Sequence, residues 1–101
     1  MKRIYIYILL FFVTAQLQLF GAIEDTVKIA ENYYASGDYS KALSYYLSVS
    51  NAGYESASLY YNIGNSYYKT GNFVKAILWY ERALLLEPGN KDVLFNLEIA
   101  R

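Results

Sequence analysis

The sequence contains no cysteine and no histidine among its 101 residues. These absences exclude disulfide bonds, structural zinc sites built on thiolate or imidazole ligands, and cysteine nucleophiles. They also exclude a serine–histidine catalytic pair. With most routes to covalent catalysis closed, we expect no metal ion, no cofactor and no catalytic residue in this protein.

The chain also has no excess of either charge, because nine basic and nine acidic side chains give a formal net charge of zero. A nucleic-acid-binding protein needs a basic excess to neutralise phosphates, so we expect no nucleic-acid partner. Proline occurs once, whereas hydrophobic residues make up 55% of the chain and tyrosine alone contributes 13 residues. This composition predicts one folded domain, in which tyrosine rings serve half-buried packing and contact surfaces.

Residues 1–22 have the order of a secretory signal peptide. Lys2 and Arg3 form a short basic start, and residues 4–13 are an unbroken apolar run. Small residues at Gly21-Ala22 then suit a cleavage site close to the start of the folded pattern.

Two alternatives stay open for this segment. Val13-Thr14-Ala15 offers small residues for an earlier cleavage. An uncleaved membrane anchor over residues 4–23 would have the required length of about 20 residues, although it would include two glutamines. In each case the remaining chain crosses a membrane, so we expect export to the periplasm or to the outer side of the cytoplasmic membrane.

The rest of the chain repeats with a period of 34 residues. Setting Ala42 against Ala76 aligns many neighbouring positions, including Gly37 with Gly71. The period divides the chain into repeat 1 (residues 23–56), repeat 2 (residues 57–90) and the start of repeat 3 (residues 91–101).

Each copy is predicted to form two helices. In the second copy, apolar residues at a 3.6-residue period predict helices over 57–70 and 73–86. The break between them is Gly71-Asn72, because glycine can close a helix in the left-handed conformation and asparagine can cap the next one. Gly37-Asp38 marks the same break one repeat earlier, and Asn90 is the expected cap of a third helix.

These residues resemble the tetratricopeptide repeat, in which aromatic, small and proline residues recur at fixed offsets. The resemblance implies an all-α fold of helix-turn-helix repeats that form a short right-handed superhelix. The first copy is degenerate, with Thr26 in the position of the leading aromatic residue. The positions that match the repeat are Tyr60, Ile63, Gly64, Tyr67, Gly71, Ala76, Tyr80, Ala83 and Pro88.

A second face of the first helix in each copy is the predicted partner-binding groove. In proteins similar to this one, these rows line the concave side of the superhelix, so the resemblance implies a protein or peptide partner. Some similar proteins clamp a carboxylate there, but Val27 and Glu31 in the first copy favour a general groove. The predicted groove residues are Val27, Glu31, Tyr34, Ser58, Tyr61, Asn62, Asn65, Tyr68 and Lys69.

The carboxylates provide no catalytic arrangement in the sequence. Glu24, Asp25 and Glu31 are interpreted as acidic residues near the positive start of a helix. Because no nucleophile–base pair accompanies them, we expect a non-enzymatic protein, with a carboxylate-dependent hydrolase as a remote alternative.

The third unit presents an apolar stripe, Val93, Leu94, Leu97 and Ala100, that needs a cover. We therefore expect a piece of a longer protein; alternatively, the half unit is itself the cap or a partner covers it. The whole layout also resembles the BatE-type proteins of the Bacteroides aerotolerance operon. That resemblance implies an exported scaffold in a membrane-associated complex linked to stress tolerance, and a self-assembling structural piece is the alternative.

Overall fold

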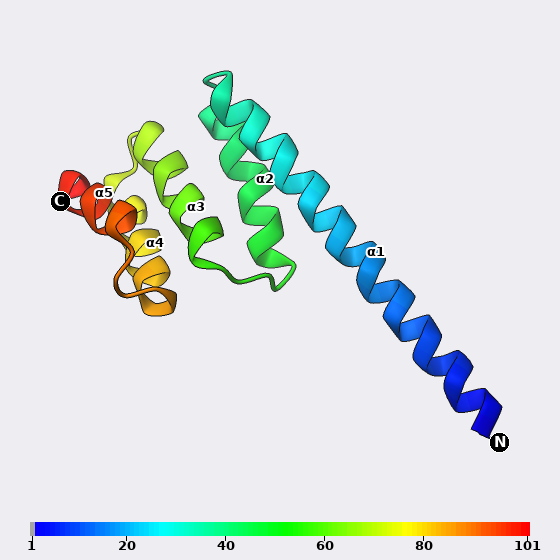
Figure 1. The fold of residues 1–101 in the computed structure, drawn as a ribbon. Helices are drawn as coiled ribbons and strands as arrows, with labels where there is room; N and C mark the ends of the chain where they lie inside the picture. Colours follow the sequence, from blue (N-terminus) through cyan, green and yellow to red (C-terminus); the bar gives the residue numbers. More distant parts are fainter. Residues whose placement is uncertain (1) are drawn as a thin grey trace.

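The computed structural model describes residues 2–101, which form an elongated array of helices measuring 60 × 29 × 18 Å (Figure 1). Within this range every regular element is helical, so the expected all-α class is confirmed. The first helix extends far beyond the others and accounts for the elongation (Figure 1). The helices are α1 (Lys2–Ala35), α2 (Tyr39–Asn51), α3 (Ala57–Lys69), α4 (Phe73–Leu86) and α5 (Lys91–Ala100).

Three helices begin at the polar residues that the repeat predicts. The side chains of Asp38, Asn72 and Asn90 each accept a hydrogen bond of 3.2 Å from the backbone N–H three residues further on. Each bond satisfies a donor that has no partner inside its own helix. α3 begins in the same way, because Ser56 Oγ accepts from the N–H of Leu59 at 3.0 Å. The 34-residue period could have predicted this fourth cap, because Ser56 precedes Asn90 by one period.

α1 and α3 end at glycines in the left-handed conformation, Gly37 with φ +86° and Gly71 with φ +84°. At the second of these, the N–H of Asn72 donates to the C=O of Tyr67 at 2.9 Å, which closes the helix end. A side chain would be strained at such a φ, so glycine is required at both breaks. The predicted glycine–Asx boundaries are therefore confirmed.

Each helix packs against the next one in the chain, and α3 also contacts α5. Two clusters of buried side chains hold the array together. One lies mainly between α1, α2 and α3, and the other lies between α3, α4 and α5. Tyr60 and Tyr67 of α3 border both clusters. Such neighbour-to-neighbour packing is typical of repeat proteins, and it places α3 at the centre of the array.

Inside the α3–α4 pair, a glycine makes room for a tyrosine ring. A Cβ at Gly64 would lie 2.6 Å from both Cδ1 and Cε1 of Tyr80. Tyr80 is 1% exposed, and Ala76 and Ala83 on the same helix are fully buried. Tyr60 packs edge-on against Trp79, with 5.3 Å between ring centroids. The structure thus pairs small and large residues between the helices.

The start of the first helix differs from the expectation. α1 begins at Lys2 and continues without a break through Gly21-Ala22, whereas the repeat pattern suggests a start near residue 23. Glu24, Asp25 and Glu31 therefore lie in the second half of α1. Their interpretation as residues at the positive start of a helix is wrong, because the apolar run before them is itself helical.

The apolar stripe of the third unit also needs one correction. Val93, Leu97 and Ala100 are buried against α3 and α4, but Leu94 is 45% exposed. Leu94 directly follows Val93 in the helix, so the two side chains point in directions about 100° apart and only one can face the core.

Candidate functional site

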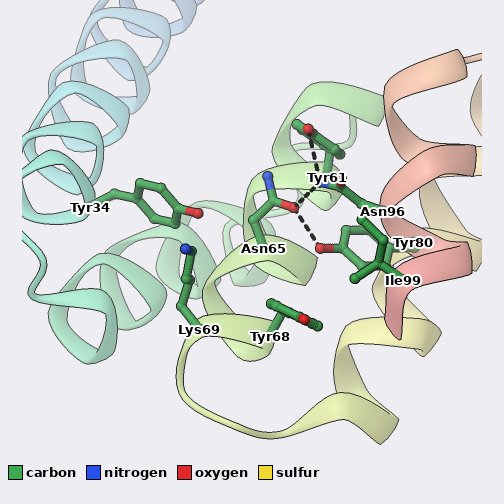
Figure 2. A pocket seen from close by; sticks show the side chains of 8 residues that line it. All are labelled: Tyr34, Tyr61, Asn65, Tyr68, Lys69, Tyr80, Asn96 and Ile99. Carbon is green, nitrogen blue, oxygen red and sulfur yellow. Dashed lines mark hydrogen bonds between the residues drawn. The ribbon is translucent and has the colours of Figure 1, made fainter. Parts of the chain in front are cut away.

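Two hollows lie along the array, each bordered by α1 and α3. The first, here called the tyrosine hollow, has a volume of about 300 Å³ and also involves α4 and α5. The second, here called the acidic hollow, has a volume of about 360 Å³ and also involves α2 and the loop that follows it. The tyrosine hollow is lined by Tyr34, Tyr61, Asn65, Tyr68, Lys69, Tyr80, Asn96 and Ile99 (Figure 2).

A hydrogen-bond network at Asn65 joins three helices beside the tyrosine hollow (Figure 2). Tyr80 Oη of α4 donates to Asn65 Oδ1 of α3 at 2.5 Å. Asn96 Nδ2 of α5 donates to the same oxygen at 2.9 Å and to Tyr61 Oη at 3.0 Å. The Asn65 oxygen thus accepts two bonds, while its amide nitrogen points away from Tyr80 and Asn96 (Figure 2). Asn65 therefore presents donors to the hollow.

Two tyrosines of the tyrosine hollow, Tyr80 and Tyr34, have a raised pKa and stay protonated far above neutral pH. Burial, followed by the nearby Tyr61 and Tyr34 hydroxyls, raises the pKa of Tyr80. Burial also raises the pKa of Tyr34, with smaller contributions from Tyr39 and Tyr61. Neutral hydroxyls can donate hydrogen bonds to a ligand, which phenolates cannot.

The rings on the rim of the tyrosine hollow are held by aromatic neighbours. The Tyr34 ring meets Tyr39 edge-on at 4.9 Å between centroids, and Tyr68 lies 5.2 Å from Phe73 in a tilted arrangement. Lys69 Nζ lies 5.6 Å from the centre of the Tyr39 ring. Rings fixed in this way lose little conformational entropy when a ligand binds.

Charge differs between the two hollows. Lys69 is the one charged residue among those that line the tyrosine hollow, which therefore favours acceptors and anions. The acidic hollow contains Glu24 and Glu31 against a single cation, Lys28. Burial, followed by the charge of Glu31, raises the pKa of Tyr46 in this hollow to about 12. The apolar part of its lining includes Phe20, Ile23, Val27, Tyr54 and Leu59.

All nine residues of the predicted groove line one of these hollows. Tyr34, Tyr61, Asn65, Tyr68 and Lys69 come together in the tyrosine hollow. The other four are separated from them and line the acidic hollow; they are Val27, Glu31, Ser58 and Asn62.

The groove prediction misses three residues of the tyrosine hollow, namely Tyr80, Asn96 and Ile99. Two of them could have been found, because Asn96 and Ile99 follow Asn62 and Asn65 by one 34-residue period. Tyr80 has the right position for core packing, and nothing in its spacing indicates that its hydroxyl reaches Asn65.

Metal binding has no support in the described residues 2–101, where no group of three or more carboxylates comes close enough to hold an ion. Glu81 Oε1 accepts from Arg101 Nη2 at 3.1 Å, and Glu98 lies 3.9 Å from the same guanidinium. These exposed pairs are surface contacts. The first part of α1 is long and apolar enough to cross a membrane.

The comparisons with known proteins agree with this arrangement of helices. Residues 57–90, which comprise α3, α4 and the turn before α5, match the family model of the tetratricopeptide repeat. The comparison with curated proteins found no match. Tetratricopeptide repeats generally mediate contacts between proteins and are typically non-catalytic. The match at residues 57–90 supports the tetratricopeptide-repeat family for this helical array.

Proposed function

We propose that this protein is a non-enzymatic adaptor that binds a protein or peptide partner in the tyrosine hollow. The observation that carries the proposal is the donor set around Asn65. Its amide nitrogen, the Lys69 ammonium and the Tyr34 hydroxyl line one hollow that contains no carboxylate. Backbone carbonyls and carboxylates of an extended segment complement such a surface.

The partner segment in this proposal runs along the inner surface of a short right-handed superhelix. Lys69 at the tyrosine hollow and Glu24 with Glu31 at the acidic hollow present opposite charges to it. A segment with an acidic or carbonyl-rich part and a basic part would match both hollows in one direction only. Complementary charges of this kind contribute more to orientation and association rate than to affinity.

The proposal places the adaptor outside the cytoplasmic membrane, in an envelope-associated complex. Its support is the apolar first half of α1, which suits a signal sequence or a membrane span. The resemblance to the BatE-type family extends the proposal to aerotolerance. A deletion strain tests this extension, because its survival in air should fall and should return when the gene is restored.

The experiment that tests partner binding starts with photocrosslinking. A photoreactive amino acid at Ile99 lies in the tyrosine hollow, whereas one at Val74, which is 79% exposed, lies outside both hollows. We expect a defined protein adduct from position 99 and none from position 74 in cells that express the full chain. Equal adducts from both positions would contradict the assigned site.

Affinity measurements with the crosslinked partner then compare two matched lysine substitutions. Lys69 and Lys75 are both exposed, and each ammonium lies near a tyrosine ring, at 5.6 Å and 5.5 Å. Lys69→Gln should weaken binding about tenfold or more, because a charge-assisted hydrogen bond contributes roughly 1.5–3 kcal/mol. Lys75→Gln should leave the Kd unchanged, since Lys75 lines neither hollow. An unchanged Kd for Lys69→Gln would refute the proposal.

Self-assembly is the second candidate function, and the surface of α5 favours it. Leu94 and Phe95 on this helix are 45% and 67% exposed. A second copy could cover them, which would add helices to the end of the array. Mass measured over a concentration series separates the two functions, because an adaptor stays monomeric without its partner and a self-assembling piece grows.

A further inference from the structure

Residues 4–13 of α1 are apolar on every side, and no other part of the described structure covers them. Every residue from Lys2 to Phe20 is exposed. Ten consecutive helical residues, 4–13, point in all directions around the helix axis, so a single protein surface could cover only some of them. A helix that is apolar all round belongs either in a protein core or in a bilayer, and this one is not buried in the protein.

The length and the ends of this segment fit a bilayer. Residues 4–23 at 1.5 Å per residue extend about 30 Å, which is the thickness of the hydrocarbon layer. Lys2 and Arg3 border the segment on one side, and Glu24 and Asp25 border it on the other. Tyrosines 5 and 7 lie close to the basic end, where aromatic rings favour the headgroup region.

The same helix enters the array without a linker. Gly21 lies inside α1 and does not adopt a positive φ, so the helix has no hinge there. Ile23 and Val27 already pack against the buried cluster between α1, α2 and α3. The last residue of the apolar segment and the first turn beyond it are therefore part of the folded array.

One edge of the array lies level with the end of the apolar segment. Leu19 and Ala22 line a shallow hollow together with Ala52 of the α2–α3 loop, and Phe20 lines the acidic hollow together with Tyr54. In Figure 1 this loop is at the end of the array from which α1 emerges. The opposite end, at Ser36, is about 20 Å further along α1.

We propose that residues 4–23 of α1 stay in the lipid bilayer as an uncleaved anchor that holds the helical array upright, with the loop Ala52–Ser56 at the headgroups. This inference deepens the proposed location outside the membrane. It does not depend on partner binding in the tyrosine hollow, so the two proposals fail separately. The sequence leaves two interpretations of this segment open, a cleaved signal peptide and an uncleaved anchor, and this inference favours the anchor.

The mass of the purified full chain is the first test. The native gene is expressed, membranes are washed with alkaline carbonate, and the intact protein is weighed by mass spectrometry. We expect the membrane-bound protein to retain residues 4–23. A product that begins near Ile23, or release into the carbonate wash, would overturn the anchor and would leave the adaptor proposal intact.

The second test measures the orientation of the array in lipid nanodiscs. Because the chain has no cysteine, single substitutions Ala52→Cys and Ser36→Cys can each carry one spin label at an exposed site. We expect the label at position 52 to collide preferentially with lipid-soluble oxygen. The label at position 36 should collide preferentially with a water-soluble nickel chelate. Equal accessibility at both positions would overturn the proposed orientation.

A linker variant tests whether the continuous helix causes the orientation. Six glycine and serine residues are inserted between Gly21 and Ala22, and Trp79 fluorescence checks that the array still folds. We expect the difference between the labels at positions 52 and 36 to shrink toward zero. An unchanged difference would show that helix continuity does not position the array, and would overturn that part of the inference.

Discussion

The contact between Gly64 and Tyr80 makes Gly64→Ala the sharpest test of the packing. In an ordinary exposed helix this change stabilises by up to about 1 kcal/mol, because alanine has the higher helix propensity. Here the new Cβ would lie 2.6 Å from two ring carbons of Tyr80, closer than carbon atoms approach in folded proteins. We therefore expect the substitution to destabilise the array instead.

The size of the effect follows from what must move. Overpacking of a well-packed core costs about 1–3 kcal/mol. Displacement of the Tyr80 ring would also weaken its hydrogen bond to Asn65, which contributes about 0.5–1.5 kcal/mol. After the gain in helix propensity is subtracted, a net loss of about 1–3 kcal/mol remains. For a domain of this size, the loss corresponds to a fall in Tm of roughly 5–15 °C.

Trp79 provides the assay, because it is the single tryptophan and lies in the array core. Thermal unfolding of the full chain in detergent is followed by its fluorescence. Gly21→Ala is the matched control, since Gly21 is also helical and a Cβ there would meet nothing within 4 Å. In a protein that already carries Tyr80→Leu, Gly64→Ala should lower Tm much less than it does in the parent. A Tm for Gly64→Ala that equals or exceeds that of the Gly21→Ala control would show that Tyr80 does not require a glycine at position 64.

Two further substitutions test the core and its tyrosines. Ala76→Asp places a charge at a fully buried site and should unfold the array, because it lowers the free energy of unfolding by about 3 kcal/mol or more. The control Val74→Asp changes a site that is 79% exposed and should leave Tm nearly unchanged. The pKa of Tyr46 in the folded protein is about 12, above its ordinary value of 10.0. The stabilisation of the folded state by the neutral Tyr46 hydroxyl is therefore complete below pH 10 and is lost as the pH rises towards 12. Between these pH values, chemical denaturation should show that the free energy of unfolding falls by about 2–3 kcal/mol more in the parent than in Tyr46→Phe. Equal falls in the two proteins would contradict the burial of the Tyr46 hydroxyl.

The 34-residue period predicts most of the fold, because it places a glycine–Asx pair at each helix break. The predicted helix over 73–86 agrees with α4, and the one over 57–70 ends one residue beyond α3. The start of α1 is missed for a physical reason. A signal-like apolar run and a repeat helix are both helical, so no breaker separates them in the sequence.

The predicted groove consists of one row of side chains in each copy, and in the structure its nine residues line two hollows. Helical spacing identifies which side chains share a face of α3, and Tyr61, Asn65 and Tyr68 line the same hollow. Spacing cannot show which residues of other helices approach that face. The bonds from Tyr80 and Asn96 to Asn65 join positions 15 and 31 residues away, and they depend on how α4 and α5 stack.

In the proposed binding mode, Asn65 donates hydrogen bonds to a partner while its oxygen holds the array together. Asn65→Asp tests it, because one carboxylate oxygen can still accept from Tyr80 and Asn96 while the donor is replaced by an acceptor. We expect a Tm within roughly 5 °C of the parent and a Kd for the crosslinked partner raised about tenfold or more. A folded Asn65→Asp variant that binds the partner as tightly as the parent would show that the Asn65 amide does not donate to the partner.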